Sequence, residues 1–330
     1  MKKKYINPLF SILITILHLV NCSIIVAQNT TLDLSGIWQF QIDRNDVGVK
    51  EQWFSKKLVD KITLPGSMNE NRKGDDVTLH TQWTASIYDS SFFYNPRLEK
   101  YRDPDNLKLP FWLTPVKYYV GVAWYQKEVT IPANWKGKRI VLFLERPHIE
   151  TRVWANNKEI GMQNSLSVPH VYDLTSYLKP GKNTLSVRVD NRIKDIDVGK
   201  DSHSITDQTQ GNWNGIVGKI ELRSTPKSHI DDIRVFPDVK NKKALVKLSL
   251  RGNSSGILTL EANSFNSDTL HSVVPVIRNY KIDKDSLRLD VELPMGEEMQ
   301  TWDEFHPTLY RLKITMKSGK NETDVKETYF

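Results

Sequence analysis

Short runs of alternating apolar and polar residues recur along nearly the whole chain, and no long stretch repeats the i, i+3, i+4, i+7 spacing of an amphipathic helix. The runs are rich in Val, Ile, Leu, Tyr and Trp and end at Gly, Pro, Asn or Asp, as strands joined by turns do. Residues 149–155 alternate in this way and lead into Asn156-Asn157, a pair that tolerates the positive φ of a tight hairpin. The pattern predicts an all-β protein.

The runs fall into two groups, as expected for 330 residues. In the first group, strands are expected at 32–42, 121–131, 139–146, 149–155, 183–191 and 216–223. After Thr225-Pro226 comes a second series of about seven short strands, which is the size and rhythm of an immunoglobulin-like sandwich. We therefore expect one β-sandwich domain over 28–226 and another over 227–330.

The first 27 residues read as a signal peptide. Three lysines at positions 2–4 precede an apolar run over 9–20, which is too short and too early to favour a transmembrane helix. Cleavage after Ala27 predicts export to the periplasm or the exterior, and a lipoprotein anchored at Cys22 is the alternative. Because Cys22 is the only cysteine, no internal disulfide framework or cysteine-based zinc site can form.

The net charge of +7 does not indicate nucleic-acid binding. Part of the excess lies in the three lysines of the signal peptide, and the other basic residues are dispersed without a block of like charge. The histidines are scattered as well, with no i, i+4 pair. We expect no nucleic-acid partner, no metal site and no cofactor.

One segment, residues 66–117, contains few clean strands and many aromatic residues. Long loops inside a compact domain are usually functional or disordered, and the aromatic content argues against disorder. An ordered insertion that packs on a neighbour or a ligand is therefore expected.

Several segments, in the right order, resemble glycoside hydrolase family 2. They lie at 34–40 (LSGIWQF), 64–67 (LPGS), 121–127 (GVAWYQK), 152–161 (RVWANNKEIG), 172–178 (YDLTSYL), 211–216 (GNWNGI) and 302–310 (WDEFHPTLY). The resemblance implies a jelly-roll sugar-binding domain followed by an immunoglobulin-like domain.

In that family the catalytic centre belongs to a third domain, a (β/α)8 barrel with two Glu residues. The present sequence stops at Phe330, about where the barrel would begin. Retaining hydrolysis needs two carboxylates at close range, so we assign no catalytic residue and expect the chain to be inactive by itself.

The resemblance also supplies candidate sugar-binding residues. In β-galactosidases of the family, a loop with an Asp followed by Gln reaches the active site, and Asp207-Gln208 resemble it. A carboxylate suits this role because its charge-assisted hydrogen bonds to sugar hydroxyls are strong. Trp83 and Tyr88 of the insertion are candidates for stacking on sugar rings, with packing inside the domain as the alternative.

The function expected from the sequence is the non-catalytic N-terminal part of an exported β-glycosidase, most like a β-galactosidase. Its partners are a β-glycoside or oligosaccharide substrate and the catalytic barrel of the same polypeptide, and a homo-oligomer is possible. The alternatives are a stand-alone glycan-binding protein and a parent enzyme that is a β-glucuronidase or β-mannosidase.

Overall fold

The computed structural model describes residues 30–194, 199, 201–203, 205–319 and 321–330, with only the backbone of 321–323. The expected signal peptide, and Cys22 within it, lie outside the described residues, so export stays a prediction. Within the described ranges, no helix is long and apolar enough to cross a membrane.

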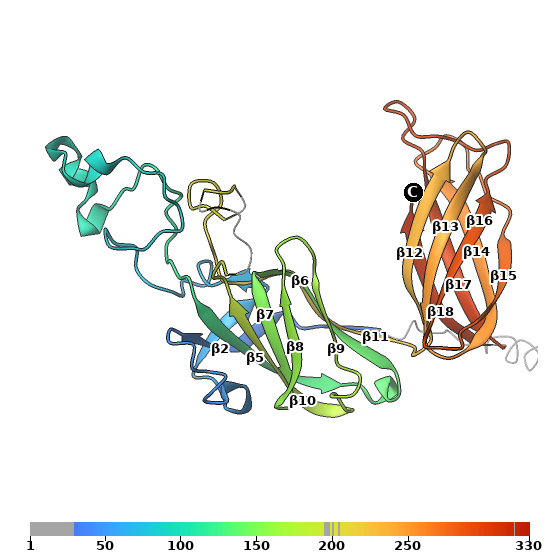
Figure 1. The fold of residues 1–330 in the computed structure, drawn as a ribbon, viewed down its shortest axis with the longest axis horizontal. Helices are drawn as coiled ribbons and strands as arrows, with labels where there is room; N and C mark the ends of the chain where they lie inside the picture. The colour runs from blue at the N-terminus through green and yellow to red at the C-terminus, as the bar shows by residue number, and fades with distance from the viewer. Residues whose placement is uncertain (1–29, 195–198, 200, 204, 320) are drawn as a thin grey trace, which may run out of the picture. The chain divides into compact units, whose positions relative to one another are not determined.

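The first domain is a sandwich of two antiparallel sheets (Figure 1). One sheet has the order β1 (Thr31–Asp33), β11 (Gly215–Thr225), β6 (Arg139–His148) and β9 (His170–Asp173), and β4 (Gly66–Ser67) also pairs with β11. The other has the order β3 (Asp60–Leu64), β2 (Gly36–Asp43), β5 (Val122–Ile131), β10 (Gly181–Asp190), β7 (Glu150–Ala155) and β8 (Lys158–Asn164). The expected jelly-roll sandwich is confirmed.

The second domain is a smaller antiparallel sandwich with seven strands. One sheet has the order β12 (His229–Asp238), β13 (Lys243–Arg251) and β16 (Ser286–Pro294). The other has the order β15 (Val276–Lys281), β14 (Ser255–Phe265), β17 (Leu309–Ser318) and β18 (Asn321–Tyr329). The immunoglobulin-like architecture is likewise confirmed.

Strand alternation produces both cores, because successive side chains point to opposite faces of a sheet. In β2, Trp38 and Phe40 are buried between the sheets, whereas Ile37 is exposed. In β13, Ala244, Val246, Leu248 and Leu250 point inward in the same rhythm. Each domain therefore has its own apolar core.

The outer face of one jelly-roll sheet is covered by the loop between β2 and β3. This loop contains a short 3-10 helix, η1 (Trp53–Ser55), and Phe54 stacks on Trp154 with ring centroids 5.2 Å apart. Trp124 and Trp154 are buried there. The two tryptophans thus belong to a second, smaller apolar cluster on the outer face of the sheet.

The hairpin expected at Asn156-Asn157 joins β7 to β8, and both residues have positive φ, at 46° and 67°. Two cis peptide bonds also occur, before Pro65 and between His148 and Ile149. The strands β3, β8, β9 and β15 had not been expected from the sequence, because they are short or lie among polar residues.

The insertion, residues 66–117, adds no strand to either sheet beyond the two residues of β4. It forms three short 3-10 helices, η2 (Ser90–Phe93), η3 (Pro96–Tyr101) and η4 (Pro104–Asn106), which Figure 1 draws in teal outside both sheets. Asp89, Asn95 and Asp103 cap them by accepting hydrogen bonds from backbone N–H groups. The insertion is therefore an ordered structure, as expected.

Candidate functional site

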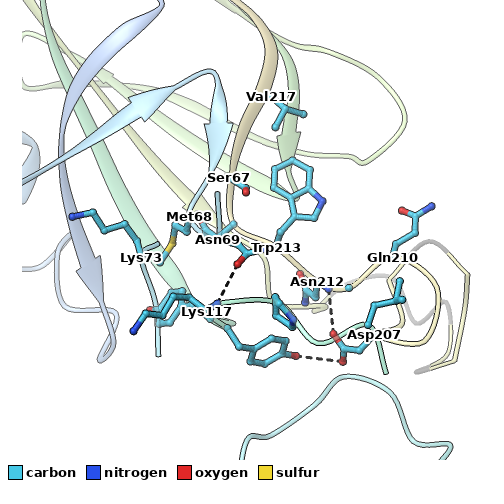
Figure 2. Close-up of a pocket in the computed structure, with 16 residues that line it drawn as sticks. Ser67, Met68, Asn69, Lys73, Lys117, Asp207, Gln210, Asn212, Trp213 and Val217 are labelled. Atoms are coloured by element: carbon cyan, nitrogen blue, oxygen red, sulfur yellow. Dashed lines mark hydrogen bonds between the residues drawn. The ribbon is translucent and has the colours of Figure 1, made fainter. Parts of the chain in front are cut away.

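A pocket of about 370 Å³ lies where the insertion meets the loops of the jelly-roll domain (Figure 2). Its walls come from β4 and the turn after it, from the end of the insertion at 113–119, and from the loop at 207–214 with the start of β11. The strands of the sandwich thus hold three chain segments around one hollow.

One wall of the pocket is apolar. The half-buried ring of Trp213 lies there beside Val217, and Met68 and Leu113 also line the pocket. The ring of His148 stacks on Trp213 with centroids 4.5 Å apart and an angle of 19°. Because one face of the indole is covered by the imidazole, the stack orients the Trp213 ring at the edge of the pocket.

His148 is neutral in this stack. Burial lowers its pKa to about 4, although the 2.7 Å hydrogen bond between its Nδ1 and the Trp213 carbonyl opposes the shift. A neutral imidazole with one N–H can donate to that carbonyl and fix the backbone of Trp213. The ring and the backbone of Trp213 are therefore held by the same partner.

The floor of the pocket is a network of buried amides. Asn191 Nδ2 donates to the Asn212 Oδ1 at 3.0 Å, and Asn212 Nδ2 donates back to the Asn191 carbonyl at 2.9 Å. Asn214 accepts from the Tyr125 hydroxyl at 2.7 Å and donates to the Gly121 carbonyl at 2.9 Å. Since buried amides that are fully paired rigidify their surroundings, the loop before β11 has one well-defined conformation.

The two lysines of the pocket are neutralised by carboxylates. The ammonium of Lys73 lies 2.6 Å from Asp60, and that of Lys117 lies 2.6 Å from Asp76. Asn69 accepts the backbone N–H of Lys117 at 3.1 Å (Figure 2). The pocket therefore presents amides, hydroxyls and an aromatic face more than it presents net charge.

Asp207 lines the pocket, but its carboxylate is buried and bound to the insertion. Its Oδ2 accepts the backbone N–H groups of Thr84 at 2.7 Å and Ala85 at 3.1 Å, and the Tyr118 hydroxyl lies 3.5 Å away. Its Oδ1 accepts the backbone N–H of Asn212 at 3.3 Å (Figure 2). Asp207 thus joins the insertion to the loop before β11.

The phenol of Tyr118 is affected by the same burial. Burial raises the pKa of Tyr118 to about 12, and the charge of Asp207 adds to the rise, while hydrogen bonds with Thr84 oppose it. The hydroxyl is therefore protonated at neutral pH and can donate to the carboxylate. This bond gives Asp207 a partner from the far end of the insertion.

The other three predicted site residues lie on the same assembly, outside the walls of the pocket. Gln208 donates from Nε2 to the carbonyl of Ile87 at 2.9 Å. Trp83 is half-buried and contacts the ring of Tyr118 at 4.8 Å, whereas Tyr88 is 50% exposed. The structure brings all four predicted residues together, and their contacts with a sugar stay predictions.

The sequence did not identify Trp213 as a residue of the pocket, because it was interpreted as a turn-anchoring ring. Its position directly before Asn214-Gly215 is typical of a turn, and its partner His148 is far away in the sequence. Asn69, Gln210 and Asn212 were not singled out either. Only the family-like segment 211–216 was a signal.

The lining residues of the pocket do not include the pair of carboxylates that retaining glycoside hydrolysis requires. Asp207 is the single carboxylate among its lining residues, and a retaining mechanism requires two about 5–5.5 Å apart. Among the described residues, no group of three or more His, Cys, Asp or Glu side chains could hold a metal ion. What the arrangement can do is bind a polar ligand that has an apolar face.

Comparison with known families matches both domains to the same family. The model for the sugar binding domain of glycosyl hydrolases family 2 matches residues 32–226, and a second model of glycosyl hydrolases family 2 matches residues 228–330. The chain belongs to glycosyl hydrolase family 2. Its sugar-binding and immunoglobulin-like domains are those expected from the sequence.

Curated relatives of this family 2 chain include a β-galactosidase and a β-glucuronidase. A β-galactosidase of Priestia megaterium is 24% identical over 300 residues, which are 87% of this chain and 26% of that protein. A β-glucuronidase of Paenibacillus borealis is 24% identical over 233 residues, which are 66% of this chain and 33% of that protein. The chain thus spans about a quarter to a third of the length of these relatives.

Solved structures show the same fold. A β-glucuronidase of Ruminococcus gnavus aligns with 91% of this chain and 44% of its own, at 17% identity and a TM-score of 0.59. A β-glucuronidase of Bacteroides uniformis aligns with 91% of this chain and 32% of its own, at 20% identity and a TM-score of 0.62. The likeness concerns the arrangement of the strands.

Proposed function

We propose that this chain is the non-catalytic N-terminal part of an exported family 2 β-glycosidase, and that its jelly-roll domain contacts the sugar substrate. The observation that carries the proposal is the pocket beside Trp213 within a domain that matches the family's sugar-binding model. The immunoglobulin-like domain braces a catalytic barrel elsewhere in the same polypeptide.

The chemistry of the pocket suits a pyranose ring. Such a ring has an apolar face of C–H groups and an edge of hydroxyls, and the pocket is lined by the indole of Trp213 and by the amides of Asn69 and Gln210. Burying an apolar face on an aromatic ring is favourable, and hydroxyls need hydrogen-bond partners once they leave water. Asp207 is the single carboxylate among the residues that line the pocket.

The substrate of the parent enzyme is a β-galactoside or a β-glucuronide, as the names of the relatives suggest. Among the described residues that line the pocket, the two lysines, Lys73 and Lys117, are each paired with a carboxylate, Asp60 and Asp76, and so are less available to a uronate. This favours a neutral sugar, so a β-galactoside is the leading substrate.

Binding by the chain itself tests the proposal. We expect the chain to bind galactosides weakly, in the millimolar range, and Trp213→Ala to abolish this binding in titrations followed by NMR. Trp302→Ala is the matched control, since Trp302 is 60% exposed in the second domain. Unchanged binding by Trp213→Ala would refute the role of the pocket.

Activity assays test the non-catalytic part of the proposal. The purified chain is expected to hydrolyse neither a chromogenic β-galactoside nor a β-glucuronide, and the coding DNA downstream of the Phe330 codon is expected to continue in frame into a barrel. A stop codon there would favour the stand-alone glycan-binding protein.

Mass spectrometry of the exported protein tests the proposed export, because it distinguishes cleavage after Ala27 from a lipid anchor at Cys22.

A further inference from the structure

The insertion carries a surface of exposed aromatic rings next to the pocket. Tyr88 is 50% exposed, Phe93 39% and Tyr94 72%, and all three lie in or beside the short helix η2. Exposed aromatic rings in a group are unusual because each ring costs free energy in contact with water. A ligand or partner that covers these three rings would remove this cost.

The rings are held rigidly. Phe92, between Ser91 and Phe93, is fully buried and contacts Phe93 and Phe111 edge-on at 5.3 and 5.5 Å. The guanidinium of Arg102 donates to the carbonyls of Phe92 at 2.7 Å and Asn95 at 3.0 Å. A surface whose backbone is fixed in this way loses little conformational entropy when it binds.

An unbroken series of ring contacts connects this surface with the pocket. Tyr118, in the pocket wall, contacts Trp83 at 4.8 Å, and Trp83 contacts Trp112 at 4.7 Å. Trp112 contacts Tyr88 at 6.0 Å, and Tyr88 contacts Phe93 at 5.8 Å. Packed rings therefore connect the exposed rings of Tyr88 and Phe93 with the pocket wall.

The insertion is also joined to the loop that carries the pocket. Asp207 and Gln208 bind the backbone at Thr84, Ala85 and Ile87, and Asp201 accepts the backbone N–H of Ser86 at 2.9 Å. All these bonds lie within a few residues of Tyr88. The position of the exposed rings relative to the pocket is thus fixed by hydrogen bonds at one edge.

We propose that Tyr88, Phe93 and Tyr94 form a binding platform for the sugar units of a long oligosaccharide beyond the unit in the pocket. This inference rests on the proposed function and names the substrate class: a polymeric glycan rather than a disaccharide. The occupant is a glycan because ring contacts and hydrogen bonds join this group of rings to the pocket, and because the phenol hydroxyls of Tyr88 and Tyr94 can bond to sugar hydroxyls.

The test compares ligands of increasing length on the full chain. β-1,4-linked galacto-oligosaccharides from the disaccharide to the hexasaccharide are titrated by calorimetry. Affinity is expected to increase by about tenfold or more over the series, and the double variant Tyr88→Ala/Tyr94→Ala is expected to lose most of this gain while its affinity for the disaccharide is unchanged. Tyr177→Ala, a partly exposed tyrosine elsewhere in the domain, is the matched control.

The outcomes separate the platform from the pocket. Disaccharide binding without any gain with length, or a gain that the double variant keeps, overturns the platform and leaves the proposed function intact. No binding at any length by the wild-type chain overturns both. If the double variant instead changes the mass of the chain in light scattering and has no effect on glycan binding, the rings belong to an interface between copies, and the platform is again overturned.

Discussion

The two sandwiches of this chain differ in what they bury. The first buries charged side chains, namely Asp43, Glu150, Arg188, Asp190 and Asp207, whereas the second buries no Asp, Glu, Lys or Arg among its described residues. Buried charges need partners, and those partners fix the loops that supply them. The domain that carries the pocket therefore combines its apolar core with buried charged contacts, and the second domain has an apolar core without buried Asp, Glu, Lys or Arg among its described residues.

Ion pairs on the outer face of a jelly-roll sheet illustrate the first kind of stabilisation. Arg188 on β10 binds Glu150 at 3.0 Å and Asp190 at 3.1 Å, and it reaches Asp46 in the covering loop at 2.8 Å. Burial alone would raise the pKa of Asp190, but hydrogen bonds from Arg192 and Lys194 outweigh it and hold the pKa well below its usual range. The cluster joins the loop to the sheet.

The largest effect is expected from Arg188→Ala. The variant leaves the carboxylates of Glu150 and Asp190 buried without their central partner, which costs about 3–5 kcal/mol of unfolding free energy. Denaturant unfolding followed by tryptophan fluorescence measures the loss, since eight of the nine tryptophans belong to the first domain.

Arg234→Ala in the second domain is the control for this prediction. Arg234 binds Asp232 at 2.8 Å on the surface, where both side chains are more than half exposed. Exposed pairs contribute about 0–1 kcal/mol. Equal losses in the two variants would contradict the contrast between the domains.

Leu260→Ala tests the second kind of stabilisation. Leu260 on β14 is completely buried in the apolar core of the second domain, so its truncation is expected to cost about 3 kcal/mol. The loss is expected to be the same at pH 7 and pH 5, because Leu260 belongs to a cluster of apolar side chains. Hydrogen exchange of the β14 amides follows the unfolding of this domain; a pH-dependent loss would count against a purely apolar core.

More of the strands of the second domain than of the first could be predicted from the sequence, because the second domain depends mainly on the alternation of apolar and polar residues. In β13 and β16 the alternation of buried and exposed residues determines which face is core, so strands could be located from local pattern alone. The insertion has no such period, because its structure comes from capped 3-10 turns and from ring contacts between distant residues such as Trp83 and Trp112.

The candidate site shows the same limit. Asp207 and Gln208 could be singled out from a resemblance, but nothing local indicates that the Asp207 carboxylate binds Thr84, more than a hundred residues away. The stack of His148 on Trp213 also joins the end of β6 to the loop before β11, which are neighbours only because β6 and β11 pair in the sheet. Contacts of this kind depend on tertiary packing.

Asp207→Asn is expected to loosen the insertion. The amide has no charge, and its N–H groups face backbone donors, so about 2 kcal/mol of hydrogen-bond stabilisation is lost. Hydrogen exchange at Thr84 and Ala85 is expected to accelerate, while exchange in the second domain stays as it was. Unchanged protection of these two amides would show that other contacts hold the insertion.

The smallest expected effect is the contribution of His148 to the pH dependence of the unfolding free energy. The pKa of His148 is about 4 in the folded chain, against about 6.5 for an unfolded histidine. Above pH 6.5 neither state is protonated; as the pH falls below it, only the unfolded state binds the proton, so stability decreases. By pH 5 the loss from this group is about 2 kcal/mol.

His148→Asn removes this contribution, so its unfolding free energy is expected to fall by about 2 kcal/mol less between pH 7 and pH 5 than that of the wild type. His170, whose pKa burial also lowers, is present in both proteins and cancels in the difference. His306→Gln is the control, because His306 is an exposed side chain of the second domain. If His148→Asn kept the full pH dependence, the loss would come from other groups, and acid would not act on the stack that orients Trp213.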